Sequence, residues 1–398
     1  MVSSIFPSSR NIALESLAQF APRAGHLYTS GRNIDSGPDQ LGAVSRLSPY
    51  VRRRLITESE IVATVFARHG LKAAEKFVQE VLWRTYWKGW LEMRPAVWAR
   101  FLTERDIQRD AFSDRRALAD AENGLTGIEG FDDWARELVE TGYLHNHARM
   151  WFASIWIFTL HLPWTLGADF FLRHLIDADA ASNTLSWRWV AGLQTAGKTY
   201  LATPENIARY TCGRFAPAGL AHEAIALKEP PLDPPRAIPE SASPEACHPA
   251  LLLVTDEDMH PESIFPDRSA FKAAHVAVDA DLLWGEKARH FAHAAAKDTA
   301  SRIASHFGCP VKLTDTLDAE TLMAASEAAG VRQIVSPYAP VGPVADRLAR
   351  LDRELAGNGV TFTQVRRDWD ARFWPHATRG FFAFKDRLSS VLHELGLA

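Results

Sequence analysis

Acidic, amide and indole side chains are concentrated in one short segment, residues 176–189. Asp177 and Asp179 alternate there, Asn183 follows four residues later, and two tryptophans separated by one residue close the segment. Carboxylates and an amide can hydrogen-bond the polar edge of a planar ring, and indoles can stack on that ring or pass electrons to it. We therefore expect this segment to hold a redox-active ring system. For Asn183 alone, a helix cap is also a credible interpretation.

A second pattern places Glu80, Trp83, Arg84 and Trp87 at helical spacing, on one face of an expected helix. An acid, an indole and a cation on one face suit stacking on a planar base and hydrogen-bonding of its edge. An exposed Glu–Arg pair above two core tryptophans explains the same pattern equally well.

A third pattern is the loop Ser45-Arg46-Leu47-Ser48, which lies ahead of a helix expected to start near Thr57. Hydroxyls and backbone amides in a loop before a helix can bind phosphate. A capped turn without a ligand is the alternative, and the loop alone favours it.

Tryptophan is unevenly distributed, because ten of the thirteen residues lie between Trp83 and Trp189. Such an excess in a helical domain usually means a large core. Stepwise electron transfer through a flavoprotein would need the same residues, but composition alone favours the core.

The bulk composition is that of a soluble globular protein of two domains, with 398 residues, 47% hydrophobic and 23% charged. We expect no membrane span, no signal peptide and a cytoplasmic location. Three distant cysteines predict no disulfide framework, and no Cys/His cluster predicts a metal site. The net charge of −4 is unusual for a nucleic-acid binder. The one basic run, Arg52-Arg53-Arg54, is either a solvated helix face or a phosphate contact.

The domain organisation follows from a change in pattern along the chain. Residues 1–227 show helical periodicity, with helices expected over 73–93, 141–160 and 168–176. Residues 228–249 contain seven prolines and predict an extended linker. Residues 250–398 alternate short apolar runs with helical stretches, which predicts a parallel sheet covered by helices. We expect the strands at 251–255, 274–278, 311–314, 333–336 and 361–365, and the helices between them at 285–307, 319–329 and 344–356.

Four segments together resemble motifs of the DNA photolyase/cryptochrome family, in the family's order: 45–50, 80–87, 125–150 and 176–189. The resemblance is specific over roughly residues 10–210 and looser over 250–385. It implies an all-helical photolyase-type FAD-binding domain followed by a five-stranded parallel Rossmann-like α/β domain. The family usually has the two domains in the reverse order, so this order resembles a circular permutation, which a surface linker tolerates.

The resemblance also implies roles for individual residues. FAD would be bound by Tyr28, Ser45, Arg46, Leu47, Ser48, Arg84, Asn146, Arg149, Asp177, Asp179 and Asn183. The residues that would bind the damaged bases are Glu80, Trp83, Asn146, Met150 and Trp189. The catalytic set would be Glu80, Asn183 and the electron-relay residues Trp187 and Trp164. Arg149 would pair with Asp177 beside the flavin ring.

The chain departs from the family pattern at several positions. Ala121 stands where the outer tryptophan of the electron relay is expected, and Trp134, Trp151 or Trp156 could replace it. The arginines that normally follow the first strand are replaced by Asp256-Glu257-Asp258, so the antenna pigment stays uncertain and a structural lobe without pigment is as well supported.

The function that the resemblance implies is light-driven repair of cyclobutane pyrimidine dimers in UV-damaged DNA by electron transfer from reduced FAD. One alternative is a cryptochrome-like blue-light photoreceptor that binds FAD without repair activity. A light-independent flavoprotein is the third interpretation. Among repair enzymes, the retained Glu80, Trp83, Asn146, Met150 and Trp189 favour a dimer photolyase over a (6-4) photolyase. DNA contact through Arg52 and Arg53 is expected to weaken with salt.

Overall fold

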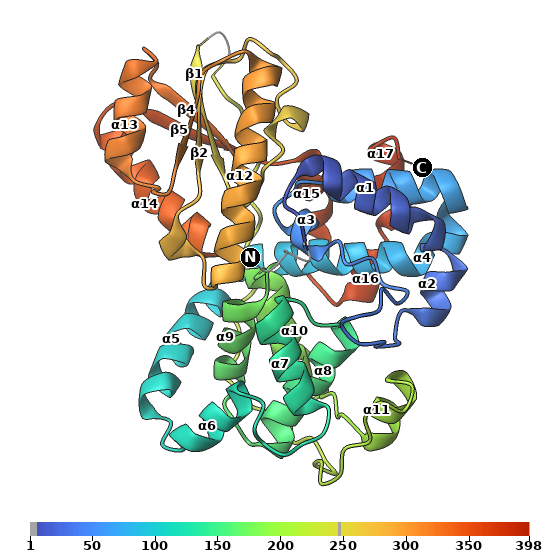
Figure 1. The fold of residues 1–398 in the computed structure, drawn as a ribbon. Coiled ribbons are helices and arrows are strands. Elements are labelled where there is room, and N and C mark those ends of the chain that lie inside the picture. Colours follow the sequence, from blue (N-terminus) through green and yellow to red (C-terminus); the bar gives the residue numbers. More distant parts are fainter. Residues whose placement is uncertain (1–5, 246–247, 398) are drawn as a thin grey trace.

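The computed structural model describes residues 6–245 and 248–397, and two lobes follow one another along the chain. Helices occupy the first part, and a five-stranded sheet with covering helices occupies residues 250–365 (Figure 1). The predicted fold class is therefore confirmed.

The first part contains α1 (Arg10–Phe20), η1 (Ala21–Arg23), α2 (His26–Gly31), α3 (Ser48–Arg52), α4 (Glu58–Glu92), α5 (Pro95–Ala111), α6 (Arg115–Glu122), α7 (Phe131–Thr141), α8 (Asn146–Ser154), the π-helical turn η2 (Ile155–Thr159), α9 (Trp164–His174), α10 (Ala180–Val190) and α11 (Pro204–Tyr210).

Helix α4 carries several of the predicted site residues. Its expected start near Thr57 is confirmed, because Thr57 and Glu60 form a capping box in which each side chain accepts a hydrogen bond from the other's backbone N–H. The helix expected over 73–93 is the second part of α4. Gly70, with φ 70°, interrupts the helical backbone in a conformation that glycine adopts without strain.

The two later helices differ from expectation at their starts. Gly142 adopts φ 71° and ends α7, so the helix expected from residue 141 begins only at Asn146. The last residues of the helix expected over 141–160 form the π-helical turn η2. The helix expected over 168–176 is α9, which begins after Pro163 and ends at His174. Proline at the N-terminal boundary is a common helix start that the apolar spacing alone did not reveal.

The sheet is parallel throughout, with strand order β3-β2-β1-β4-β5. Its strands match the predicted apolar runs closely, although β2 begins three residues earlier than expected. The elements are β1 (Ala250–Thr255), β2 (Phe271–Ala277), β3 (Val311–Thr314), β4 (Gln333–Pro337) and β5 (Thr361–Val365), with the turns η3 (Pro261–Ser263) and η4 (Ala280–Leu282) and the helices α12 (Glu286–Phe307), α13 (Ala319–Ala328) and α14 (Pro343–Gly357).

Strand β1 is buried along its whole length, and its residues are apolar from Ala250 to Val254, because both faces of the sheet are covered. Leu252 belongs to a buried cluster that includes Phe291 of α12. Its neighbour Leu253 belongs to a second cluster that includes Leu348 of α14. Strand β1 is thus the central strand of a sheet that is covered on both faces.

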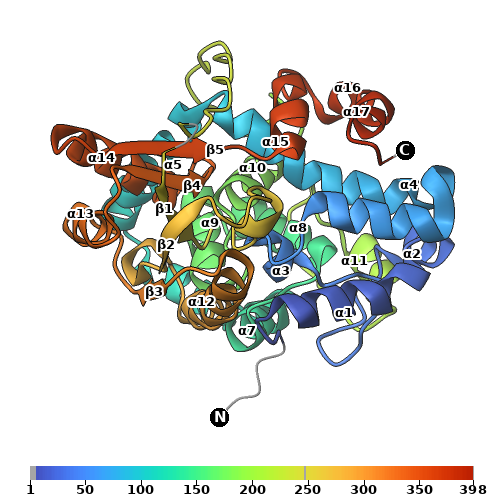
Figure 2. The same cartoon turned by 90° about the horizontal axis from the view of Figure 1, so that it is seen from above.

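The end of the chain leaves the sheet and returns to the helical lobe. After β5 it forms α15 (Asp368–Phe373), η5 (Trp374–His376), α16 (Phe381–Lys385) and α17 (Leu388–Glu394), and α15, η5 and α16 pack on α4 (Figures 1 and 2). The contact is close, because a Cβ atom on Gly89 would lie 2.9 Å from the Cα atom of Trp374. The indole N–H of Trp369 donates to the Thr85 hydroxyl at 3.0 Å.

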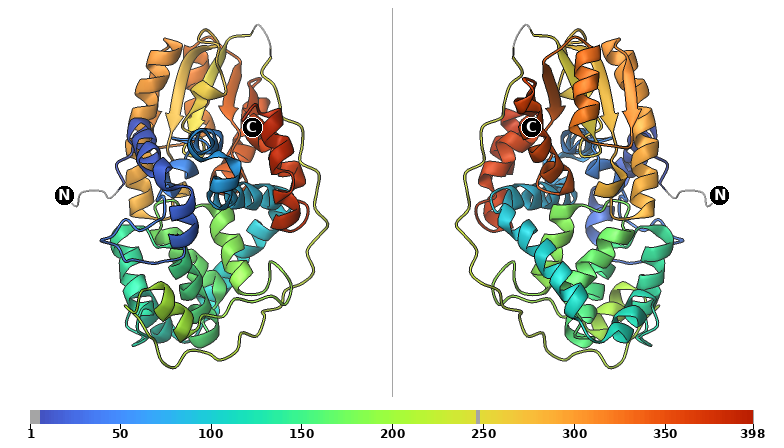
Figure 3. Two further views of the ribbon diagram at one scale, coloured as in Figure 1. Left: turned by 90° about the vertical axis from the view of Figure 1, so that its right-hand side faces the viewer. Right: turned by 90° about the vertical axis from the view of Figure 1, so that its left-hand side faces the viewer.

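The described residues of the Pro-rich segment have neither helix nor strand, and Figure 3 shows them running along the outside of both lobes. Two ion pairs attach this segment, since the Glu229 carboxylate meets Arg188 of α10 and Arg100 of α5. Arg236 donates its backbone N–H to the carbonyl of Met93 at 2.9 Å.

The basic run Arg52-Arg53-Arg54 corrects both sequence interpretations, because its residues are only 5%, 0% and 2% exposed. It is neither a solvated helix face nor available to DNA phosphates. These arginines pair with the acidic turn after β1: Arg52 with Glu257 at 2.7 and 2.6 Å, Arg53 with Asp256 at 3.7 Å, and Arg54 with Asp258 at 3.3 Å and also with Asp370. The run joins the two lobes, since a buried charge needs a close partner of opposite sign.

Candidate functional site

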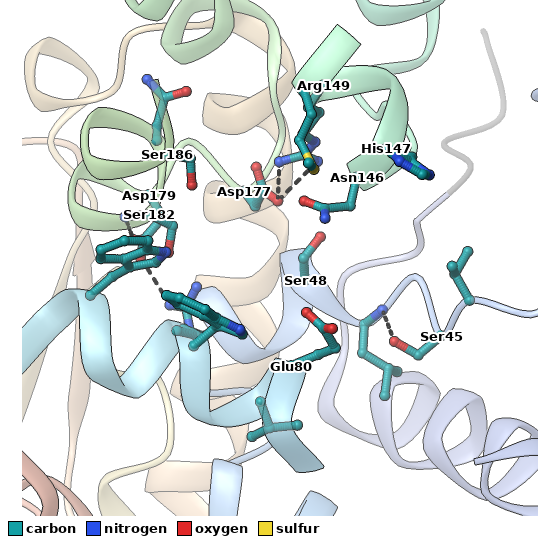
Figure 4. A pocket seen from close by; sticks show the side chains of 18 of the residues that line it. Ser45, Ser48, Glu80, Asn146, His147, Arg149, Asp177, Asp179, Ser182 and Ser186 are labelled. Carbon is teal, nitrogen blue, oxygen red and sulfur yellow. Dashed lines mark hydrogen bonds and ion pairs between the residues drawn. The ribbon is translucent and has the colours of Figure 1, made fainter. Parts of the chain in front are cut away.

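A cavity of about 540 Å³ lies in the helical lobe, where the loop before α3 meets α4, α8, α9 and α10. Its volume is within the range of small-molecule and cofactor sites. Most of the residues predicted from sequence line it: Tyr28, Ser45, Leu47, Ser48, Glu80, Trp83, Arg84, Asn146, Arg149, Met150, Asp177, Asp179, Asn183, Trp187 and Trp189. Figure 4 shows Glu80, Ser48, Asn146 and the Arg149–Asp177 pair directed toward one shared space.

Two predicted residues do not line this cavity. Arg46, with φ 52°, points back along its own loop and donates to the carbonyls of Pro38 and Gln40. Trp164 at the start of α9 packs on Phe101 of α5, with ring centroids 5.7 Å apart.

The two carboxylates of the Asp-x-Asp motif reach the cavity through an unusual backbone turn. Ala178 between them has φ 33°, a left-handed conformation that costs a residue with a side chain about 1–3 kcal/mol. Asp179 then caps α10 by accepting a hydrogen bond from the Ser182 N–H at 2.7 Å. Strain of this kind persists where the surroundings fix the conformation, as the cap does here.

The predicted Arg149–Asp177 pair is present. Both terminal guanidinium nitrogens lie 3.3–3.4 Å from one carboxylate oxygen of Asp177, while Nε of Arg149 donates to the carbonyl of Leu144 at 2.9 Å. The pair is partly open, with 23% and 10% of the two side chains exposed. A ligand in the cavity therefore has access to both charges.

Asp179 lies among three cations. Arg84 donates to its carboxylate at 3.0 Å, and Arg52 and Lys88 lie 3.7 and 3.8 Å away. Burial alone would raise the pKa of Asp179, but these cations outweigh it and hold the pKa well below its usual range. The site thus keeps a fixed negative charge surrounded by a positive shell.

Three buried polar atoms of cavity-lining residues have no hydrogen-bond partner among the described residues: the Ser48 hydroxyl, Nε of Arg84 and the indole nitrogen of Trp187. Buried donors are nearly always satisfied, so unpartnered donors on residues around a cavity fit a site that holds a bound group. The Asn183 amide nitrogen donates to the Ala168 carbonyl at 2.8 Å, which leaves its side-chain oxygen for a ligand. This donor set fits a flavin with its phosphates and polar ring edge.

Trp187 lies against the backbone of α9 because Gly167 has no side chain. A Cβ atom on Gly167 would lie 2.3 Å from the ring of Trp187 and 2.9 Å from the indole nitrogen of Trp156. The rings of Trp187 and Trp156 meet edge to face at 6.2 Å. Trp156, one of the replacements considered from sequence, is therefore an immediate neighbour of Trp187.

Arg32 is a cavity residue that sequence reasoning missed. Its Nε atom lies 3.9 Å from the Glu80 carboxylate. Although 41% of the Glu80 side chain is exposed, desolvation by its dense surroundings raises the carboxyl pKa, and Arg32 only partly opposes that effect. The sequence spacing could have identified Arg32, because it follows the predicted site residue Tyr28 by four residues, or about one helical turn.

Among the described residues, no group of three or more His, Cys, Asp or Glu side chains is arranged to hold a metal ion. Within the same residues, no helix combines the length and apolar character that crossing a membrane requires.

Comparisons with known proteins point to the same part of the chain. Residues 77–211 match the family model for the FAD binding domain of DNA photolyase. A deoxyribodipyrimidine photo-lyase of Streptomyces griseus is 37% identical over 188 residues, which cover 45% of this chain and 40% of that protein. The Thermus thermophilus protein of the same name is 35% identical over 157 residues, or 39% and 37% of the two chains.

Among solved structures, a class III photolyase from Agrobacterium tumefaciens matches with a TM-score of 0.44 and 27% identity over 52% of this chain and 43% of its own. This chain thus spans about two fifths of the length of the curated relatives that it matches.

Proposed function

Because the chain belongs to the photolyase/cryptochrome family through its helical FAD-binding domain, we propose that it repairs cyclobutane pyrimidine dimers in DNA with light. One observation carries this proposal. A single cavity joins the charged and amide residues expected to hold FAD with the acid and indoles expected to meet a damaged base. We also propose that the family's two domains occur here in reversed order.

FAD would be held by the Arg149–Asp177 pair, Asp179 and Asn183 around its ring and ribityl chain, and by Ser48 at its phosphates. The cofactor supplies the light-driven electron that opens the dimer. The chain's own contribution is orientation and charge: Asp179 stays ionised within its cation shell, and the Asn183 amide is fixed by the Ala168 carbonyl.

The substrate side consists of Glu80, Trp83, Asn146, Met150 and Trp189, all on the cavity wall. A dimer flips from the duplex more easily than intact bases, because its stacking is already weakened. Trp83 and Trp189 then offer flat surfaces to the flipped bases. Desolvation raises the pKa of the Glu80 carboxyl, and the protonated form of this group can donate a hydrogen bond to a base carbonyl.

A photoreceptor without repair activity is the second candidate, and one observation favours it. The basic run Arg52-Arg53-Arg54, the only such run in the sequence, is buried between the lobes and withdrawn from DNA. A repair enzyme would then rely on scattered surface cations for phosphate contact, whereas a photoreceptor needs none.

An illuminated repair assay on a thymine-dimer oligonucleotide separates the two candidates. We expect repair by the native chain under blue light with a reductant, and a sharp loss in Glu80→Ala with FAD still bound. Glu15→Ala, on the exposed surface of α1, is the matched control and should repair normally. A native chain that binds FAD but leaves the dimer intact would favour the photoreceptor. Full repair by Glu80→Ala would remove Glu80 from the proposal.

A further inference from the structure

The indole of Trp83 is in contact with an aromatic ring from the end of the chain. Phe381 of α16 stacks on it, with ring centroids 3.7 Å apart and planes inclined by only 8°. Phe381 is 5% exposed, whereas Trp83 still borders the cavity. Phe381 thus covers one side of the indole and leaves cavity-facing surface for a ligand.

The other rings around Trp83 do not provide a parallel surface. Trp87 is tilted by 37° at 5.1 Å, and Tyr86 meets the indole edge to face, at 82° and 5.7 Å. Of these three neighbours, only Phe381 holds the plane of Trp83 by a flat stack. Aromatic pairs of defined geometry contribute beyond the area they bury.

Helix α16 is itself attached to α4 on both sides of Phe381. The Tyr86 hydroxyl donates to the Arg379 carbonyl at 2.8 Å, and Lys385 pairs with Glu75 at 2.8 Å. The adjacent Phe382 is 77% exposed. Phe381 is thus fixed against the site, whereas Phe382 is exposed and meets Phe381 only edge to face, at 6.1 Å.

We propose that Phe381 is a positioning residue of the substrate side: it holds the Trp83 indole in the plane that accepts a flipped base. The C-terminal segment then completes a site whose other residues come from the first half of the chain. A side chain that is already ordered loses less entropy on binding, so a fixed indole binds a base more tightly than a mobile one. This inference rests on the proposed function.

The test compares Phe381→Leu, which keeps apolar volume but removes the flat ring, with Phe382→Leu as the matched control. For Phe381→Leu we expect about 3- to 10-fold weaker binding of a thymine-dimer oligonucleotide, as expected for loss of an aromatic pair. FAD content, affinity for undamaged DNA and turnover at saturating dimer should stay as in the native chain, and the melting temperature should fall only by the few degrees that loss of one aromatic pair costs. Phe381→Tyr should restore dimer affinity, and Phe382→Leu should change nothing.

Several results would overturn the inference. One is a Phe381→Leu chain that binds the dimer as tightly as the native chain. Another is a loss of FAD, or of affinity for undamaged DNA, in proportion to the loss of dimer affinity, since that marks a structural role. If Phe381→Leu does not fold, Phe381→Met takes its place under the same criteria. A native chain without preference for the dimer would instead refute the proposed function, and the inference with it.

Discussion

Removal of Glu257 tests the assignment of the basic run to the interface between the lobes. Its carboxylate accepts two hydrogen bonds from Arg52, at 2.7 and 2.6 Å, and both side chains are only 6% exposed. Glu257→Ala leaves Arg52 and the nearby Lys88 to share Asp179, which also binds Arg84. An uncompensated buried charge costs about 3–5 kcal/mol.

An exposed pair provides the matched control. Arg372 and Glu394 lie 2.8 Å apart with 42% and 51% of their side chains exposed, so Glu394→Ala should cost only about 0–1 kcal/mol. The free energy of unfolding is measured by urea titration, with circular dichroism and tryptophan fluorescence followed together. If the unfolding transitions followed by the two probes no longer coincide in Glu257→Ala, the two lobes unfold separately.

A double variant separates charge from packing. Arg52→Met with Glu257→Leu replaces the pair by apolar groups and should recover most of the stability, because no unpaired charge remains. The reasoning is refuted if Glu257→Ala costs no more than Glu394→Ala. It is refuted equally if Arg52→Ala weakens DNA binding without loss of stability, since that would place Arg52 at the phosphates.

Three further predictions concern pH and packing. Burial alone would raise the pKa of Asp258, but Arg367 outweighs it and lowers the pKa to about 2. This group therefore stabilises the fold at neutral pH and loses its contribution as pH falls from its ordinary value of 3.8 toward 2, a loss that acid titration of Asp258→Asn should lack. Gly167→Ala should displace Trp187, cost about 1–3 kcal/mol by overpacking, and lower flavin content measured by absorbance. Because the pKa of Glu80 is raised, dimer affinity should fall as pH rises through that pKa, and Glu80→Gln should bind without this pH dependence.

Each of these predictions has a contrary result. Identical acid titrations for the native chain and Asp258→Asn would assign the acid loss to other groups. For Gly167, the control is Gly357→Ala, because a Cβ atom there meets open space, and equal flavin content in all three proteins would contradict the packing argument. A pH profile that persists in Glu80→Gln would place the titrating group elsewhere.

The sequence predicted the elements whose signals are local. The apolar runs gave five strands to within a few residues, because strands buried on both faces show continuous hydrophobicity. Most motif residues do line one cavity, since each motif keeps its side chains on one helix face or loop. Their individual roles stay predictions.

What the sequence did not predict depends on contacts between distant segments. Arg52 was read as a surface residue because its partner, Glu257, lies about half the chain away. The two complementary runs were visible, but nothing local indicates that they meet. The stacking of Phe381 on Trp83 is of the same kind. The late start of α8 had a local cause, the left-handed Gly142, which hydrophobic periodicity does not detect.

The claim that a flavin occupies the cavity beside the Arg149–Asp177 pair is tested most directly by the absorbance of the purified chain and of one variant. We predict a yellow protein that releases equimolar FAD on denaturation and bleaches under blue light with a reductant. Asp177→Ala should be pale, while Asp267→Ala in the α/β lobe keeps its colour. A colourless native chain that takes up no added FAD, or an Asp177→Ala variant with full flavin content, would contradict the account.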